Sequence, residues 1–315
     1  MSAIKAIVIM GPTASGKSTL AMKLAKALKG EIISVDSALV YQGMDIGTAK
    51  PTIKEREQIP HHLIDLLDPK EAYSTGRFLT DANACIESIA NRQSLPILAG
   101  GTMLYFNALL KGLSSLPAAD PDIRAALDQA LREKGLESLH AELQGIDPIS
   151  AKRIHPNDPQ RILRALEVFM ISGIPLSEHF LKSAPKSTSY DIIPLILMPS
   201  NRERLHQRIQ ERFIEMIKEG FIEEVKALKA RSDLTPEHPS MRAVGYRQIW
   251  DYLEDQYDYS TMLERGVIAT RQFAKRQITW LRKEQDVPIF DSEGSKLFDE
   301  VMTYLSQSLL DEVRL

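Results

Sequence analysis

Residues 11–18, "GPTASGKS", match the phosphate-binding pattern G-x-x-x-x-G-K-[ST]. A β-branched apolar run at residues 4–10 precedes them, and apolar residues at helical spacing follow from Ser18 onward. Strand, glycine-rich turn and helix are the context that such a loop requires. The stretch therefore predicts a phosphate-binding loop in an α/β domain. The motif specifies a polyphosphate and leaves the remainder of the ligand open.

The composition excludes several classes of protein. The chain has 315 residues, of which 43% are hydrophobic and 26% charged, with a formal net charge of −3. A core of ordinary size is therefore expected, and any nucleic-acid site must be local because the chain has no basic excess. The single cysteine, Cys85, excludes a disulfide framework; it is a small buried side chain or a reactive thiol. No apolar segment reaches the roughly 20 residues that span a bilayer, so we expect no membrane partner and a cytoplasmic protein.

Alternating strand and helix patterns predict a parallel sheet with helices on both faces. Besides residues 4–10, the expected strands are residues 31–37, 61–69, 94–102, 191–199 and 287–290. Long helical patterns occupy residues 200–228, 241–255 and 260–285. Residues 121–186 show helical patterns and no convincing strand. We therefore expect an α/β core formed by residues 1–120 and 187–315, with an all-helical insertion at residues 121–186.

Nucleotide-reading motifs do not accompany the phosphate loop. No N-K-x-D guanine motif occurs, which argues against a GTPase. The run at residues 94–102 ends in Gly-Gly-Thr, where a nucleotide hydrolase often has a metal-bridging Asp. Lys17 is placed to reach phosphate oxygens, and the Ser18 hydroxyl to bind Mg²⁺. A P-loop small-molecule or nucleoside kinase remains one interpretation.

Asp36 stands at the end of the run at residues 31–37, and a glycine-rich segment without helical or strand period follows it. Ligands of open α/β sheets bind outside the carboxyl ends of the strands. Asp36 is therefore either a base directed at a substrate or a turn or helix N-cap carboxylate. His61 and His62 lack a third ligand at metal spacing, so we expect them to be strand-entry residues.

Basic residues beside aromatics gather in residues 241–250 and 270–283. Such sets suit phosphate contacts and base stacking, although a solvated helix face is the ordinary explanation. In residues 154–168, Arg161 and Arg164 share a helix face and can either pair with Asp158 or Glu167 or bind a ligand. A non-catalytic RNA-binding module is therefore a further interpretation.

Six stretches occur in an order that resembles the bacterial tRNA dimethylallyltransferases, also called tRNA isopentenyltransferases. They are "GPTASGKS", "SVDSALVYQGMDIGTAKP", "AGGTMLYF", "IHPNDPQRILRALEV", "RAVGYRQIW" and "TRQFAKRQITWLR". The resemblance covers nearly the whole chain and implies a P-loop NTPase-like fold. It implies an enzyme that uses Mg²⁺ and moves a dimethylallyl group from dimethylallyl diphosphate to tRNA, and we expect this enzyme to be a monomer. The acceptor would be N6 of the adenosine immediately 3′ of the anticodon, in the anticodon stem-loop, with pyrophosphate released.

The same resemblance assigns roles to individual residues. Asp36 would be the general base, and Lys17 and Thr102 would complete the catalytic set. Ser18, the metal ligand, stands where many relatives have Thr, a change that keeps the hydroxyl. The diphosphate site would comprise Gly11, Pro12, Thr13, Ala14, Ser15, Gly16, Lys17, Ser18 and Arg212. The tRNA contacts would be Asp36, Ser37, Ala38, Leu39, Thr102, Arg124, Gln160, Arg161, Ile162, Leu163, Arg164, Arg242, Ala243, Val244, Gly245, Tyr246 and Arg247.

Overall fold

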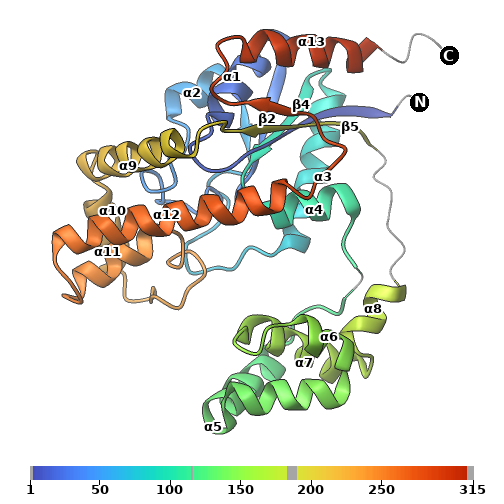
Figure 1. Ribbon diagram of the computed structural model, residues 1–315, viewed down its shortest axis with the longest axis vertical. Helices are drawn as coiled ribbons and strands as arrows, with labels where there is room; N and C mark the ends of the chain where they lie inside the picture. The colour runs from blue at the N-terminus through green and yellow to red at the C-terminus, as the bar shows by residue number, and fades with distance from the viewer. Residues whose placement is uncertain (1–2, 115, 183–189, 311–315) are drawn as a thin grey trace. The chain divides into compact units, whose positions relative to one another are not determined.

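The computed structural model describes residues 3–114, 116–182 and 190–310. The chain divides into two compact units, a core unit of residues 1–110 and 188–315 and a helical unit of residues 111–187 (Figure 1). The helical unit begins ahead of residue 121, where the sequence pattern placed its start. Leu116 accounts for the difference, because it packs against the apolar core of that unit.

A parallel sheet organises the core unit. Within the described residues the strand order is β3-β2-β4-β1-β5-β6, and every neighbouring pair is parallel. The strands are β1 (Ile4–Met10), β2 (Gly30–Val35), β3 (His61–His62), β4 (Leu95–Gly100), β5 (Tyr190–Met198) and β6 (Ile289–Asp291). The prediction of a parallel sheet is confirmed. The carboxyl ends of β1, β4 and β2 lie side by side at one edge of the sheet.

The run at residues 61–69 was predicted as a strand, and this prediction is wrong beyond its first two residues. Leu63 and Asp65 have left-handed backbone, with φ of 62° and 56°, which ends the extended conformation. The amides of Asp65 and Leu66 donate to the carbonyls of Leu39 and Val40. The segment therefore hydrogen-bonds to the loop after β2, and the sheet ends early at this edge.

Helices cover both faces of the sheet (Figure 1). Alternate β1 residues point to opposite faces, so Ile7 and Ile9 pack on one side and Val8 on the other. The first side is covered by α1 (Lys17–Leu28) and α13 (Leu297–Leu310). The second is covered by α3 (Thr75–Asn91), α4 (Met103–Lys111) and the end of α12 (Tyr259–Leu281). None of the helices in the described ranges is long and apolar enough to cross a bilayer.

A further apolar cluster joins the loop after β2 to the C-terminal helices. These are α9 (Arg202–Lys218), α10 (Phe221–Lys229), α11 (Tyr246–Leu253) and α12. The helical pattern of residues 200–228 is divided at Gly220, which has φ of 104°. The pattern expected from residue 241 becomes helical at Tyr246, because Gly245 has φ of 91°. Residues 241–245 consequently form a turn rather than a helix. A short helix, α2 (Ile53–Gln58), begins at a capping box formed by Thr52 and Glu55.

The helical unit contains α5 (Pro121–Ile146), α6 (Pro148–Arg153), α7 (Pro159–Ser172) and α8 (Leu176–Lys182). Asp147 and Asp158 cap α6 and α7 by accepting hydrogen bonds from backbone amides, and a proline follows each of them at the start of the helix. α5 is interrupted at Gly135, where φ is 77° and ψ 165°. Leucine and isoleucine side chains from α5 and α7 form the core of the unit.

Candidate active site

A cavity of about 350 Å³ lies outside the carboxyl ends of β1, β2 and β4, in the core unit. Its walls come from the loops that follow these strands, from α9 and α12, and from the turn before α11. The lining residues that the sequence predicted are Thr13, Ala14, Asp36, Ser37, Ala38, Thr102, Arg212, Arg242, Ala243, Val244 and Tyr246. The fold thus brings together residues that lie far apart in the chain.

The phosphate loop has the conformation that an anion requires. Ala14 and Gly16 both have left-handed backbone, with φ of 61° and 83°. Such alternation turns successive amides toward one point and forms an anion-binding nest. α1 begins at Lys17 without a side-chain cap, so its first amides remain available to a ligand. Gly16 is required for its backbone conformation rather than for space, since a Cβ there would meet no atom within 4 Å.

Asp36 and Arg212 line the cavity, and both interact electrostatically with Lys17. Burial lowers the pKa of Lys17 to about 8, with Asp36 opposing the shift and Arg212 adding to it. Burial also lowers the pKa of Arg212, and Asp36 again opposes the shift. The Lys17 ammonium donates a hydrogen bond to the carbonyl of Pro12 at 3.3 Å. Two cations facing one carboxylate leave an excess of positive charge, which favours an anionic ligand.

Ser37, the residue after Asp36, links Asp36 to Thr102. The Asp36 Oδ1 accepts a hydrogen bond from the amide of Ala38 at 2.8 Å, which gives Asp36 the turn role considered from sequence. Thr102 Oγ1 accepts from the amide of Ser37 at 3.0 Å and donates to the Ser37 hydroxyl at 3.4 Å. Among the described residues, no hydrogen bond reaches the other Asp36 oxygen, Oδ2. The turn therefore orients Asp36 and leaves this oxygen available to a substrate.

Apolar side chains of α9, α10 and α12 complete the cavity. Phe213 and Phe221 meet edge to face with ring centroids 6.2 Å apart, and Phe221 meets Tyr246 in the same way at 4.8 Å. Met216 and Phe273 add to the lining. The cavity therefore combines a charged end with an apolar wall.

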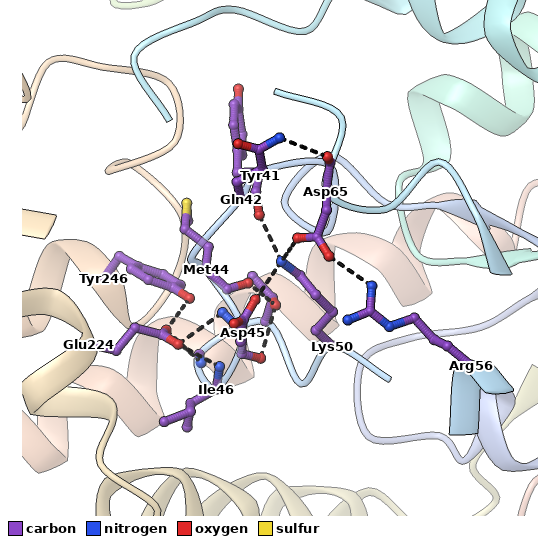
Figure 2. A network of polar contacts seen from close by, with 12 residues as sticks. Tyr41, Gln42, Met44, Asp45, Ile46, Lys50, Arg56, Asp65, Glu224 and Tyr246 are labelled. Carbon is purple, nitrogen blue, oxygen red and sulfur yellow. Dashed lines mark hydrogen bonds and ion pairs between the residues drawn. The ribbon is translucent and has the colours of Figure 1, made fainter. Parts of the chain in front are cut away.

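A polar network fixes the loop at residues 43–50 and includes Tyr246 (Figure 2). Glu224 Oε2 accepts the amides of Asp45 at 2.9 Å and Ile46 at 2.7 Å. Its Oε1 accepts the amide of Gly47 at 3.2 Å and the hydroxyl of Tyr246 at 2.6 Å. Burial and the neighbouring Glu224 carboxylate raise the pKa of Tyr246. One carboxylate thus joins this loop to Tyr246, one of the residues predicted to contact tRNA.

Lys50 anchors the other end of the same loop (Figure 2). Its side chain is 2% exposed, and its ammonium donates to the carbonyl of Tyr41 at 2.7 Å. It also pairs with Asp45 at 2.6 Å and with Asp65 at 2.5 Å, and Asp65 pairs in turn with Arg56 at 2.7 Å. No sequence motif predicted a role for these residues. The sequence signal that could have found them is a lysine in the "DIGTAKP" stretch, which has no helical or strand period and therefore needs specific bonds to hold its shape.

The arginines of the helical unit that were predicted to contact tRNA form ion pairs within the unit. Glu167 is 2% exposed, and its two oxygens bind Arg124 at 2.8 Å and Arg164 at 2.6 Å. Burial alone would raise the pKa of Glu167, but hydrogen bonds from Arg164 and Arg124 outweigh it and lower the pKa. Arg161 pairs with Asp158 at 3.4 Å. All three arginines therefore have carboxylate partners.

Several predicted tRNA contacts differ in accessibility. Ile162 is fully buried in the core of the helical unit, so its side chain cannot contact a ligand. Leu39 and Leu163 are half-buried, and Gln160 is exposed. Arg242 and Arg247 are exposed, and Arg242 is the one that lines the cavity. The accessible part of the predicted set is therefore polar and mostly basic.

Three other sequence interpretations bear on the site. Arg276 lines the cavity beside Phe273, with its guanidinium 5.8 Å from the ring centroid. His62 binds Glu31 at 2.7 Å, and the described residues hold no group of three side chains suited to a metal. Cys85 is half-buried, and burial raises the pKa of its thiol. His62 is thus held by an ion pair at the start of the sheet, and Cys85 packs against the apolar core.

Comparison with known proteins places this arrangement in a family. The family model described as IPP transferase matches residues 39–284, and the one described as isopentenyl transferase matches residues 4–71. A tRNA dimethylallyltransferase of Methylococcus capsulatus is 59% identical over 93% of this chain and 94% of its own. That of Nitrosococcus oceani is 53% identical over 97% of each chain.

Solved structures agree with the sequence comparison. The tRNA isopentenylpyrophosphate transferase of Bacillus halodurans superposes with a TM-score of 0.73 at 36% identity, covering 99% of this chain and 98% of that one. A eukaryotic dimethylallyltransferase solved acting on tRNA gives a TM-score of 0.83 at 29% identity, over 98% of this chain and 79% of that one. The matches span the phosphate loop, the cavity and the helical unit, and this chain belongs to the IPP transferase family.

Proposed function

We propose that this protein transfers a dimethylallyl group from dimethylallyl diphosphate to N6 of the adenosine immediately 3′ of the anticodon in tRNA. Pyrophosphate leaves, and N6-dimethylallyladenosine remains in the tRNA. The observation that carries the proposal is the cavity, in which an anion-binding loop, a carboxylate with a free oxygen and an apolar wall meet. Those are the surroundings that a diphosphate, an amine losing a proton and a hydrocarbon group require. The curated relatives bear the name of this activity.

The donor diphosphate would occupy the loop at residues 11–18, with Lys17 and Arg212 beside it. As the allylic C–O bond breaks, its electron pair moves to the diphosphate, so negative charge grows on the leaving group. Cations and amides fixed at that point stabilise the transition state more than the bound donor. The allylic carbon gains positive character, and the aromatic rings of Phe213 and Phe221 would stabilise it. The apolar wall would exclude water from this carbon.

The acceptor nitrogen would approach from the side of Asp36. Its lone pair forms the new C–N bond, and the N6 proton becomes acidic as that bond forms. The free oxygen of Asp36 would take this proton, so deprotonation before attack is not needed. Thr102 would keep this part of the site in place through its hydrogen bond from the amide of Ser37.

A magnesium ion fits the site without a dedicated set of carboxylates. Mg²⁺ that is bound with substrate phosphates takes one or two protein ligands and keeps several waters. The exposed hydroxyl of Ser18, at the start of α1, would supply such a ligand next to the diphosphate. When bound, the ion would neutralise part of the charge of the diphosphate.

Recognition of tRNA would use the exposed basic side chains. The adenine must leave its stack to enter a cavity of this kind, at a cost of a few kcal/mol. Arg242 and Arg276 at the cavity would contact the extruded nucleotide or its phosphates, and Arg247 the neighbouring backbone. Gln160 and Arg161 of the helical unit would contact the anticodon stem-loop. One chain supplies every proposed group of the reaction, so we propose that the protein acts as a monomer. We also propose that it acts in the cytoplasm, where its proposed tRNA substrate is found.

The test combines the purified protein with Mg²⁺, isotopically labelled dimethylallyl diphosphate and an unmodified tRNA transcript. We expect label to enter the tRNA, and nuclease digestion with mass spectrometry to place it on the adenosine 3′ of the anticodon. A transcript with guanosine at that position is the matched control and should stay unlabelled. ATP in place of the donor tests the kinase alternative, for which phosphoryl transfer to a small acceptor is expected. Folded protein that leaves the adenosine transcript unlabelled would disprove the proposal.

Asp36→Asn distinguishes the enzyme from a binding module. The amide keeps the size and can still accept the hydrogen bond from Ala38, but it cannot take a proton. We expect turnover to fall by about 10²–10⁴-fold, the usual contribution of a general base, with tRNA affinity retained. Normal turnover of this variant would show that another group accepts the proton.

A further inference from the structure

Helix α12 carries a buried side-chain amide that touches two other parts of the core unit. Gln277 is 4% exposed. Its Oε1 accepts a hydrogen bond from the backbone amide of Thr13 at 2.8 Å, and its Nε2 donates to the carbonyl of Gly101 at 2.8 Å. A single planar group therefore connects the phosphate loop after β1 with the end of β4.

The chemistry of these two contacts requires an amide. Thr13 presents a donor and Gly101 presents an acceptor, and a carboxamide is a side-chain group that can answer both at once. A carboxylate would accept from Thr13 but would repel the Gly101 carbonyl. An apolar side chain would leave both backbone groups without partners in a buried position.

The surroundings of the amide are shaped to receive it. A Cβ added at Gly101 would lie 2.4 Å from Gln277 Nε2, so a larger residue would displace the bridge. On the other side, the Thr13 amide donates to Gln277 and is therefore not available to an anion. The bridge thus withdraws the Thr13 amide from the loop amides that remain for a diphosphate.

The bridge continues to the acceptor side of the cavity. Thr102 follows Gly101 directly, and its Oγ1 accepts the amide of Ser37, the residue next to Asp36. Through these bonds, displacement of the phosphate loop relative to β4 alters its distance from Asp36. Helix α12 also supplies Phe273 and Arg276 to the cavity lining, so the same helix positions the bridge and this part of the lining.

We propose that Gln277 is a positioning residue that sets the spacing between the donor diphosphate and the acceptor nitrogen. The inference rests on the function proposed above. Small errors in the placement of reacting groups reduce the rate by orders of magnitude, whereas binding of the separate substrates is less sensitive. Loss of the bridge should therefore act on kcat more than on KM.

Gln277→Met removes the amide while keeping the length of the side chain, and Gln272→Met is its matched control. Gln272 lies on the same helix and is exposed. For Gln277→Met we expect kcat to fall by about 10–100-fold, with the KM values for both substrates changed by less than about threefold. For Gln272→Met we expect kcat and both KM values to equal those of the unmodified protein. Unchanged kcat in Gln277→Met, or a loss confined to the KM for tRNA, would overturn the proposal.

Gln277→Glu provides an independent readout through pH. The ionised carboxylate repels the Gly101 carbonyl, but the protonated acid can donate to it while its other oxygen accepts from Thr13. The ratio of the variant's kcat to that of the unmodified protein should therefore rise as the pH falls from about 8 to about 6. A ratio independent of pH contradicts the bridge. This variant also tests the proposal if Gln277→Met does not fold.

Hydrogen exchange separates this inference from the proposed reaction. The Thr13 amide should exchange faster in Gln277→Met than in Gln272→Met, whatever substrate the protein uses. Inactive unmodified protein with fast exchange at Thr13 in Gln277→Met would disprove the reaction and keep the bridge. Active protein whose Thr13 exchange is unaffected by Gln277→Met would disprove the bridge alone.

Discussion

Replacement of Glu224 by glutamine tests the network that holds the loop at residues 43–50 (Figure 2). The carboxylate accepts four hydrogen bonds, three from consecutive backbone amides and one from Tyr246. The side chain that Glu224→Gln introduces has the same shape, but it has one acceptor oxygen and no charge. Its amino group would face the Gly47 amide and the Tyr246 hydroxyl. The hydroxyl can rotate and accept, whereas the Gly47 amide loses its acceptor.

The magnitude follows from this count. A hydrogen bond to a charged group contributes about 1.5–3 kcal/mol and one between neutral groups about 1 kcal/mol. The bonds with Asp45, Ile46 and Tyr246 become neutral, which costs about 1 kcal/mol each. The unpaired Gly47 amide adds about 1 kcal/mol, at the low end of the range for a lost partner, because Gly47 is half-buried. We therefore expect the free energy of unfolding to fall by about 4 kcal/mol.

Urea denaturation followed by tryptophan fluorescence measures this change. Both tryptophans, Trp250 and Trp280, belong to the core unit, so the signal reports the unit that contains Glu224. The matched control is Glu223→Gln. Glu223 is exposed and shares the first turn of α10, so both variants lose the same favourable interaction with the helix dipole. The difference between the two variants isolates the network.

We expect Glu223→Gln to change stability by less than about 1 kcal/mol. Hydrogen exchange at the amides of Asp45, Ile46 and Gly47 should accelerate in Glu224→Gln and stay unchanged in the control. If the two variants unfold at the same urea concentration and these amides exchange alike, then Glu224 does not hold the loop and the reasoning fails.

Three further predictions concern Lys17, Gly266 and Glu167. Since burial lowers the pKa of Lys17 to about 8, kcat/KM for the donor should decline as the pH rises through about 8, where the ammonium loses its proton; a profile flat to about pH 9 would contradict this. A Cβ on Gly266 would lie 2.1 Å from the ring of Phe213, so Gly266→Ala should destabilise the core unit by about 1–3 kcal/mol in urea denaturation. Gly76→Ala, with no neighbour nearer than 3.9 Å, is its control and should leave stability equal or slightly higher. Glu167→Ala should lower the free energy of unfolding by about 2–3 kcal/mol, measured by circular dichroism of thermal unfolding. The loss is smaller than for a fully buried ion pair because both arginine partners keep contact with water. Equal stability would show that the two ion pairs contribute nothing.

Much of the fold follows from short stretches of sequence. The phosphate loop, its flanking strand and helix, and the helical unit depend on interactions between residues near each other in the chain, which local patterns record. The predicted strand at residues 61–69 and the predicted continuous helix at residues 200–228 were wrong where the backbone conformation differs from what the spacing of apolar residues indicates. Leu63 and Asp65 adopt left-handed conformations that residues other than glycine seldom take, and bonds to the loop after β2 stabilise them there. Gly220 interrupts a helical pattern that is otherwise continuous.

The candidate site divides in the same way. Sequence alone predicted a phosphate-binding loop at residues 11–18 and placed Asp36 at a strand end, because both depend on a motif and its immediate neighbours. Tertiary structure decided which of many polar helix residues matter. Gln277 lies 264 residues from Thr13 and 176 from Gly101, and Glu224 lies 179 from Asp45. Their roles come from packing that carries distant segments within hydrogen-bond reach, and neither residue type nor spacing encodes such a contact.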